Sequence, residues 1–425
     1  MKRTAKVQGV LGAGNSVPRA PYVLGLGWGL VLWALLLAGC EKHGATPAAP
    51  DAAPDAAPDV APAASAKVDI DDPTTCAPCH AAVVEEWQQS MHSRAHADAD
   101  PLFGALLAYR VEREGEGLKA KCAQCHGPRG VEALDGPAAR AGVSCAGCHN
   151  VAELHLGEGR KGAGALVWGP AGVLRGPHDV AAGASPAHGT GPRLEALADG
   201  RSLCVACHQE EHNKAGIPTC STGLELPADG PSCVSCHMPT VEGASGQASQ
   251  RPQHRSHAFA GPHRAWLQQD VSTLRAGVKL DLAWEGDAGA KVTLTNQSAH
   301  SFPTGFPGRM AVVFVRGLDA KGAEVWRNIQ GDPMKEHPEA VLNKVYVGED
   351  GQPTLPPYGV KLARDARLGP QETRAIALPK LPPEVVRLEA TLKFWLIPPP
   401  AAKTLGVEAL PEAKPVEVVK VEIAR

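Results

Sequence analysis

The chain has 425 residues, of which 42 are basic and 45 acidic, so its charge gives no indication of a nucleic-acid partner. Aromatic residues make up only 4% of the sequence, whereas glycine and proline are abundant, with 46 and 38 copies. A chain of this length predicts about three structural units.

The first 39 residues have the pattern of an export signal rather than of a folded element. A positively charged stretch precedes an almost wholly apolar run over 22–38, which ends in Leu37-Ala38-Gly39-Cys40. This ending resembles a bacterial lipobox, in which the cysteine is acylated and the chain is cleaved before it. The alternative, an uncleaved transmembrane helix, would be at the short limit for spanning. We therefore expect a lipoprotein signal peptide over 1–39, a lipid anchor at Cys40 and an exported protein on the periplasmic side. Glu41 resembles the signals that direct lipoproteins to the outer membrane.

Residues 40–68 have the composition of a linker. The segment repeats alanine, proline and aspartate, has no apolar period and contains no aromatic residue. Such a composition cannot bury enough surface to fold, and its prolines favour an extended, semi-rigid chain. We expect a spacer between the lipid anchor and the folded part.

Five copies of the pattern Cys-x-x-Cys-His follow between residues 76 and 237. In chain order they are Cys76, Cys79 and His80; Cys122, Cys125 and His126; Cys145, Cys148 and His149; Cys204, Cys207 and His208; and Cys233, Cys236 and His237. This is the attachment pattern of c-type haem. Two thiols three positions apart can form thioethers with the vinyl groups on one porphyrin edge, and the next histidine is then held under the iron.

Zinc sites and disulfides are the alternative interpretations of paired cysteines. Two Cys-x-x-Cys pairs can form a four-cysteine zinc site, but zinc does not require a histidine after the second cysteine, and here that histidine is present in all five copies. We therefore expect five covalently attached haems c and a pentahaem cytochrome c domain over 69–268. Short helices and loops would surround the haems, which would supply much of the apolar volume, so we expect this region to be mostly unfolded without haem.

The sequence around these motifs resembles the cytochrome c-554 family of multihaem cytochromes. The resemblance rests on Trp87-Gln-Gln-Ser-Met-His92 after the first motif, Leu203-Cys204 at the fourth, and Cys236-His237-Met238-Pro239 at the fifth. It departs after the third motif, where Asn-Val-Ala replaces the family's Gly-Pro-Gly, and in having five motifs instead of four. The resemblance implies second iron ligands at the following positions: His92, His155, His188 and His257, with His263 as a further candidate.

The remaining cysteine of this region and several histidines match no such pattern. Cys220 has no intramolecular partner left, and we expect a buried thiol. Helical composition is confined mainly to 81–93 and 102–110. The histidines without a pattern are His96, His178, His212, His254 and His337.

Cysteine is absent after Trp266, and strand patterns appear instead. Seven runs of alternating or β-branched residues are separated by glycine and proline turns, at 277–284, 291–295, 310–315, 323–326, 373–378, 387–395 and 416–423. They predict an all-β sandwich over 269–425. The loop Asn296-Gln-Ser-Ala-His300-Ser-Phe-Pro-Thr-Gly305 resembles the His-x-x-Pro-Thr-Gly loop in the β-domain of related multihaem cytochromes. That resemblance implies that His300 reaches the last haem; the alternative is a turn histidine bonded only to the backbone.

Function depends on how many irons keep an open sixth position. The histidines suffice to close every iron, which favours electron transfer by a mostly bis-histidine cytochrome over catalysis. The expected partners are another cytochrome or a quinol-oxidising membrane complex, together with the membrane itself. Whether the protein is an enzyme stays open. The alternative function is an oxidoreductase with one open haem that acts on a small nitrogen or sulfur compound, and a third interpretation makes the β-sandwich a docking module.

Overall fold

The computed structural model describes residues 68–157, 159–181, 183–286 and 289–425. The chain divides into two units, 1–61 and 62–425, and all described residues belong to the second. The predicted signal peptide, Cys40 and nearly all of the linker lie outside the described residues. Among the helices that are described, none has the length and apolarity needed to cross a membrane.

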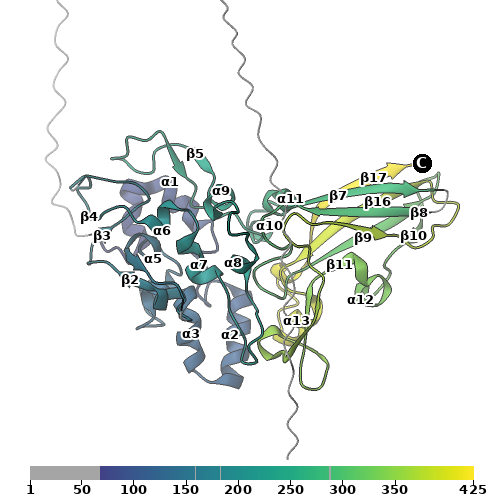
Figure 1. Ribbon diagram of the computed structural model, residues 1–425, viewed down its shortest axis with the longest axis horizontal. Helices are drawn as coiled ribbons and strands as arrows, with labels where there is room; N and C mark the ends of the chain where they lie inside the picture. The colour runs from purple at the N-terminus through teal and green to yellow at the C-terminus, as the bar shows by residue number, and fades with distance from the viewer. Residues whose placement is uncertain (1–67, 158, 182, 287–288) are drawn as a thin grey trace, which may run out of the picture. The chain divides into compact units, whose positions relative to one another are not determined.

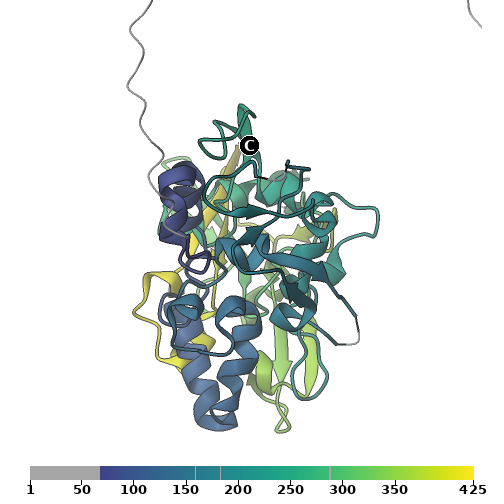
Figure 2. The same ribbon diagram turned by 90° about the vertical axis from the view of Figure 1, so that its left-hand side faces the viewer.

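Three helices dominate the amino-terminal part: α1 (Ala77–Gln88), α2 (Pro101–Glu114) and α3 (Gly117–His126). Helix α2 begins where Asp100 accepts hydrogen bonds from the backbone N–H groups of Leu102 and Phe103, with Pro101 at the first helical position. It ends at Gly115, whose φ of 91° is a conformation that glycine tolerates best. Helices α2 and α3 lie side by side in both views (Figures 1 and 2).

The rest of this part consists of short segments, as expected for a region rich in glycine and proline. The helices are α4 (Pro137–Arg140), α5 (Cys145–His149), α6 (Glu195–Ala198), α7 (Ser202–His208), α8 (Thr222–Glu225), α9 (Cys233–His237), α10 (Arg264–Leu267) and α11 (Ser272–Gly277). Three small sheets pair β1 (Val151–Leu154) with β2 (Leu166–Trp168), β3 (Val173–Leu174) with β4 (Gly189–Thr190), and β5 (Thr240–Glu242) with β6 (Gln253–Arg255).

Each Cys-x-x-Cys-His motif lies in a helical turn. The histidine of the motif is the last residue of α3, α5, α7 and α9, and in the first motif it lies within α1. A helical turn places residues three and four positions apart on one face. The local fold therefore presents the two thiols of each motif on the same side of the turn.

The carboxyl-terminal part is built from sheets. One sheet has the order β10 (Glu324–Arg327), β9 (Met310–Leu318), β16 (Arg387–Trp395), β17 (Val416–Ala424), with β11 (Val341–Leu342) also paired to β9. A second has the order β15 (Thr373–Ala377), β8 (Gly289–Asn296), β7 (Val278–Glu285), and a third joins β13 (Pro353–Thr354), β12 (Lys344–Val347) and β14 (Lys361–Asp365). Two short helices, α12 (Pro333–Glu336) and α13 (Pro399–Leu405), complete this part (Figure 1).

The first two of these sheets share one hydrophobic core. Along β8 every second residue is buried, so Val292 and Leu294 point to the same side. They belong to the same buried cluster as Val312 on β9 and Leu392 on β16. The seven strands expected from sequence coincide with β7, β8, β9, β10, β15, β16 and β17, and the expectation of a sheet-rich carboxyl-terminal part is confirmed. The strands β11–β14, which are two to five residues long, were not predicted.

Candidate haem-binding site

The imidazoles of the motif histidines are oriented by backbone carbonyl groups. In four of the five motifs the Nδ1 atom lies within hydrogen-bond distance of a carbonyl oxygen: His80 with Ser245 (2.6 Å), His126 with Ala95 (2.8 Å), His149 with Arg175 (2.6 Å) and His237 with Ala260 (2.5 Å). An Nδ1–H that donates to a carbonyl leaves Nε2 with its lone pair, which is the arrangement of a metal-binding histidine.

A second histidine ring lies near each of four motif histidines. The pairs and the distances between their ring centroids are His80–His188 (6.5 Å), His208–His92 (6.3 Å), His149–His257 (6.2 Å) and His237–His300 (6.3 Å). The partners come from distant parts of the sequence, and His300 comes from the β-rich part. Long-range folding, rather than local sequence, creates these pairs.

This spacing fits a metal ion between the two rings. A nitrogen–metal bond of about 2 Å and roughly 1 Å from that nitrogen to the ring centre put two opposed imidazole centroids about 6 Å apart. The four observed distances of 6.2–6.5 Å agree with this value. Rings packed directly on one another would be closer. The residues present therefore fit an iron held between two histidines at four of the motifs.

The second histidines are also oriented by their surroundings. Nδ1 lies near a backbone carbonyl in His188 (3.0 Å, Gly189), His257 (2.8 Å, Arg255) and His300 (3.1 Å, Ser301). The Nδ1 atom of His92 is buried without a partner. Phe259 packs edge-on against both His92 and His257, with ring centroids 4.2 and 5.7 Å apart. Phe259 follows His257 by two positions in the sequence, and this contact explains that spacing.

Burial keeps several of these imidazoles neutral. It lowers the pKa of His92 to about 3 and that of His208 to about 4, with smaller contributions from neighbouring histidines. Burial likewise lowers the pKa of His257 to about 4. Neutral imidazole is the form that binds a metal.

The motif histidine His126 has different surroundings. Its ring stacks on Phe103 with a centroid distance of 3.8 Å and an angle of 15° between the ring planes. Among the described residues, no histidine ring lies at the spacing seen in the other four motifs. A phenyl ring on the face of the imidazole lies beside the direction of Nε2 and not along it. The second motif therefore differs from the other four, a feature that the sequence did not predict.

Two histidines that the family resemblance implied as ligands have no motif histidine opposite them. His155 follows strand β1; its Nε2 lies 3.0 Å from a carboxylate oxygen of Glu153, and its side chain is 44% exposed. The altered loop after the third motif runs into the β1–β2 hairpin, and the ring opposite His149 is that of His257. His155 therefore lies outside the four ring pairs, and its role as a ligand stays a prediction. His263 is half-buried, and desolvation lowers its pKa to about 3, but it too lies outside the four ring pairs.

The histidines without a sequence pattern have other partners. Both nitrogens of His96 are in use, one near the carbonyl of Leu134 and the other near Asp98. His254 lies between the carbonyl of Gly243 and the carboxylate of Glu86. In the described part of the chain, no three Cys, His, Asp or Glu side chains converge as ligands of one metal ion.

Thiols of different motifs meet in space. Contacts within hydrogen-bonding reach join Cys76 to Cys145, Cys125 to Cys207, and Cys204 to Cys233. The first and third motifs are thus neighbours, and the fourth motif adjoins both the second and the fifth. No described cysteine is in a disulfide. Cys220 is half-buried, and its desolvation raises the pKa of the thiol to about 11, which keeps it protonated at neutral pH.

Two of the predicted haem-binding cysteines are exposed, Cys79 in the first motif and Cys236 in the fifth, whereas the other eight are partly buried. At Cys79 the helix is also interrupted. The backbone of His80 is non-helical, with φ −121° and ψ 39°, and the carbonyl oxygen of Cys79 accepts a hydrogen bond from the N–H of Gln247 at 3.0 Å. The five motifs, which are equivalent in sequence, therefore differ in structure. Haem attachment at Cys79 stays a prediction.

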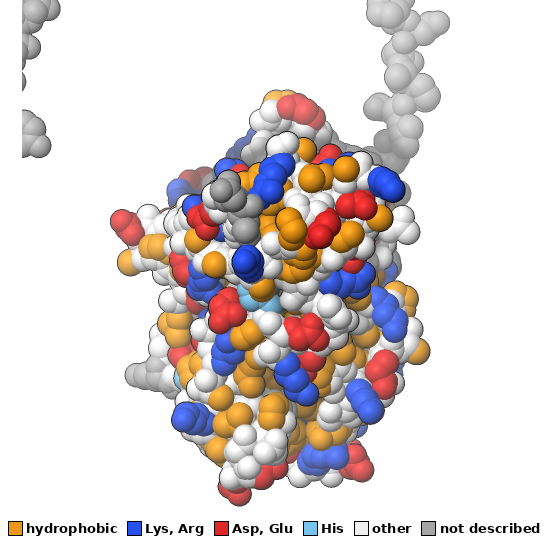
Figure 3. All heavy atoms as spheres, turned by 90° about the vertical axis from the view of Figure 1, so that its right-hand side faces the viewer, with side chains coloured by type: hydrophobic (Ala, Val, Ile, Leu, Met, Phe, Trp, Pro, Cys, Tyr) orange, Lys and Arg blue, Asp and Glu red, His pale blue; other side chains and the backbone are white. Residues whose placement is uncertain are grey.

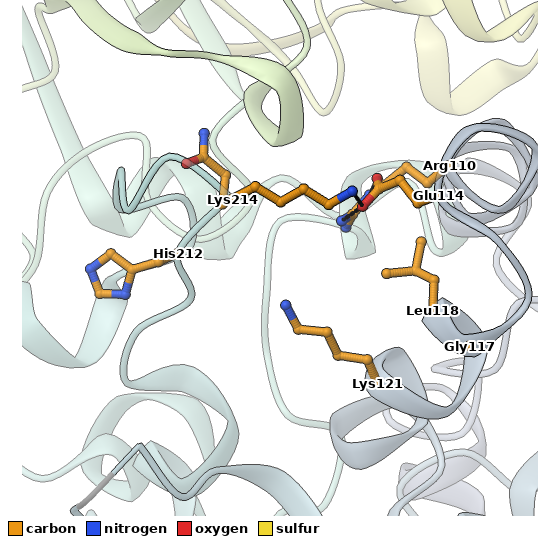
Figure 4. Close-up of a pocket in the computed structure, with 8 residues that line it drawn as sticks. Arg110, Glu114, Gly117, Leu118, Lys121, His212 and Lys214 are labelled. Atoms are coloured by element: carbon orange, nitrogen blue, oxygen red, sulfur yellow. Dashed lines mark hydrogen bonds and ion pairs between the residues drawn. The ribbon is translucent and has the colours of Figure 1, made fainter.

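A surface depression lies beside the second motif, between α2, α3 and the segment 212–214 (Figure 4). Glu114 projects into it and is reached by Arg110 at 2.8 Å and by Lys214 at 3.1 Å. These two cations hold the pKa of Glu114 down to about 2. The charged groups of the depression largely satisfy one another, so it shows no free site for a charged ligand.

Comparison with known proteins connects this geometry to a family. Residues 75–150 match the sequence family described as cytochrome c554 and c-prime. The fold matches the crystal structure of a penta-haem cytochrome c552 from Thermochromatium tepidum with a TM-score of 0.71 and 24% identity, over 85% of this chain and 100% of that one. The resemblance to the multihaem cytochromes c is confirmed. No curated protein matches the chain.

The two matches support covalently bound haem c as the cofactor. The structural match extends over the sheet-rich part as well, so the two parts of this chain occur together in another cytochrome. The name of that protein suggests the count of five haems. For this chain, the count and the individual iron ligands belong to the proposal that follows.

Proposed function

We propose that the protein is a pentahaem electron-transfer cytochrome that carries one haem c at each motif and binds four of the irons through two histidines. The four ring pairs carry this proposal, because their 6.2–6.5 Å separations suit an iron between two imidazoles. The proposed ligand pairs are His80/His188, His149/His257, His208/His92 and His237/His300. Haem iron supplies one-electron oxidation and reduction when bound.

The arrangement of the motifs supports transfer between haems. The chain brings together the attachment cysteines of motifs one and three, two and four, and four and five. These contacts place the attachment points of successive cofactors next to one another. The paired imidazoles would fix the orientation of each iron, and the Nδ1 atom of His92 is buried. We infer that electrons pass from the second motif to the fifth through the fourth, with the first and third motifs as a second neighbouring pair.

A second function is favoured by one observation. His126 has Phe103 beside it and, among the described residues, no histidine ring at the spacing of the other pairs. An iron bound there would keep its sixth position open, as catalytic haems do. The second candidate is therefore an oxidoreductase that uses this iron on a small nitrogen or sulfur compound, with the other four haems delivering electrons.

Membrane attachment and partners extend the proposal. The lipobox-like ending at Cys40 supports a lipid anchor on the periplasmic side of the outer membrane, and a second cytochrome or a quinol-oxidising complex would supply electrons. Substituting Cys40 with serine should release the protein into the soluble periplasmic fraction. Retention of the Cys40→Ser protein in the membrane fraction would argue against the anchor.

A docking role for the β-rich part has less support. On the face shown in Figure 3, acidic and basic side chains alternate, with apolar side chains between them. The large aliphatic side chains that are exposed in this part, among the described residues, are Val325 and Val360. Neither the charge distribution nor the exposed apolar surface of this face indicates a particular kind of docking partner.

Low-temperature EPR of the oxidised protein, with haem quantified on the same sample, tests the two functions. We expect five haems per chain, four of them with low-spin ferric signals and one with a high-spin signal. Nitrite, hydroxylamine and sulfite are then added in turn. A change of the high-spin signal, followed by turnover with a reductant, would favour the oxidoreductase. Five low-spin haems would instead leave electron transfer as the remaining candidate function. Fewer than five haems would contradict the proposal.

A further inference from the structure

An arginine that is half-buried, with a fully buried Nε atom, lies between the haem-binding part and the sheets. Arg309 immediately precedes β9, and its Nη1 donates a hydrogen bond to the carbonyl oxygen of Thr304 at 2.8 Å. Its Nε is buried and, within the part of the chain that the structure describes, has no hydrogen-bond partner. Among the described residues, no carboxylate forms an ion pair with it. A buried donor without a partner is costly, and a buried charge without a counter-ion is more so.

The guanidinium remains charged despite its burial. Burial lowers the pKa of Arg309 to about 10, and the nearby Cys220 and Asp100 act in the opposite direction. At neutral pH the cation is therefore present and needs an anion. Asp100 does not supply one by direct contact, because its Oδ1 caps α2 through the N–H groups of Leu102 and Phe103.

The other nearby carboxylate is already paired. Glu225 accepts hydrogen bonds from Arg367 at 2.6 Å, from Thr304 Oγ1 at 2.6 Å and from the backbone of Ser301. Both members of the Glu225–Arg367 pair are nearly buried, at 9% and 12% exposure. The protein has thus provided a counter-ion for Arg367 and, within the described residues, none for Arg309.

Histidines surround this cation. Its charge acts on His208, His263 and His300, lowering the pKa of each in addition to the effect of burial. His208 belongs to the fourth motif, and His300 pairs with His237 of the fifth. The backbone makes room for it as well: a Cβ on Gly305, where φ is +79°, would lie 2.5 Å from Nη1 of Arg309. The guanidinium therefore lies among the proposed iron ligands, in space that the absence of a side chain at Gly305 leaves open.

We propose that Arg309 binds a propionate carboxylate of the haem at the fourth or fifth motif and thereby raises the reduction potential of that haem. This inference rests on the proposed haem binding. Haem brings carboxylates of its own, and the planar fork of arginine is suited to a carboxylate. A fixed positive charge nearby favours the iron state with fewer positive charges, which is the reduced one. The β-rich part thus supplies a ligand, His300, and a counter-ion from the same loop.

The test is a redox titration of holoprotein carrying Arg309→Gln or Arg309→Lys, followed by optical and EPR spectroscopy. Arg327→Gln is the matched control, because Arg327 lies in the same part of the chain, is exposed and pairs with Glu324. With Arg309→Gln, the reduced-to-oxidised ratio of one haem at fixed potential should fall about tenfold, equal to about 59 mV for a one-electron couple. Arg309→Lys should give a smaller fall, and Arg327→Gln none.

Two results would overturn the inference. One is an unchanged set of potentials in Arg309→Gln or, if that variant does not fold, in Arg309→Lys, with all five haems attached. The other is a nitrite-induced spectral change in the wild type that Arg309→Gln abolishes while the potentials stay the same, since the guanidinium would then serve an external anion. A wild-type haem content below five would instead contradict the proposed function.

Discussion

At the scale of single residues, His300 makes the sharpest prediction, because it alone among the paired histidines comes from the β-rich part. Its ring lies 6.3 Å from that of His237, and Asn296 Nδ2 donates to its carbonyl oxygen at 2.7 Å, which fixes the loop. Replacing His300 with alanine should leave one iron without its sixth ligand. We expect one additional high-spin haem per chain in EPR, with haem content unchanged. His300→Met should instead restore a low-spin haem at a higher potential, since methionine ligation raises it.

The matched control for this experiment is His155→Ala. His155 was expected as a ligand from the family resemblance, but its ring reaches Glu153 rather than a motif histidine. The substitution should leave the EPR spectrum unchanged. A new high-spin signal in His155→Ala, or none in His300→Ala, would reverse the assignment of these two residues.

At the scale of elements, α8 and the loop after β8 are joined by Glu225, which predicts a pH dependence. Burial acts to raise the pKa of Glu225, but the charge of Arg367 and the hydrogen bonds from Thr304 and Arg367 outweigh it and hold the pKa below 4.5. A carboxylate with a depressed pKa in the folded state contributes stability above its unfolded value, and this stability is lost as the pH falls through the folded pKa. Glu225→Gln should therefore lower the free energy of unfolding by about 3 kcal/mol at neutral pH. The difference from the wild type should shrink below pH 4.5.

Denaturant unfolding followed by circular dichroism between pH 3 and 7 measures this difference. Glu324→Gln is the comparison, because its partner Arg327 is half-exposed and such surface pairs contribute little. A Glu225→Gln effect of constant size from pH 7 to pH 3 would show that the lost carboxylate charge is not the cause.

The same elements show how much could be predicted from the sequence. The seven predicted strands of the carboxyl-terminal part consist of alternating or β-branched runs, so their positions followed from local pattern. His92, His188, His257 and His300 were expected as ligands from a family resemblance, but which motif histidine each one faces depends on contacts more than 60 residues apart in the chain. Phe103 beside His126, and Arg309 without a carboxylate partner among the described residues, carried no sequence signal. A phenylalanine in a helix and an arginine before a strand are ordinary residues until tertiary packing surrounds them.

At the scale of the whole molecule, the hydrophobic core is unevenly distributed. The large buried cluster lies in the β-rich part, whereas the described haem-binding part has one small cluster of Val151, Leu194 and Leu203. With so little apolar burial of its own, the haem-binding part depends on its cofactors for a core.

A chain produced without haem attachment should exchange its amide hydrogens rapidly over 69–268, while β9, β16 and β17 remain protected. Hydrogen exchange with mass spectrometry of the holo and haem-free chains measures this contrast. Protection over 69–268 without haem would show that the polypeptide alone supplies the core, and loss of protection in all three strands would show that the β-rich part depends on the haems as well.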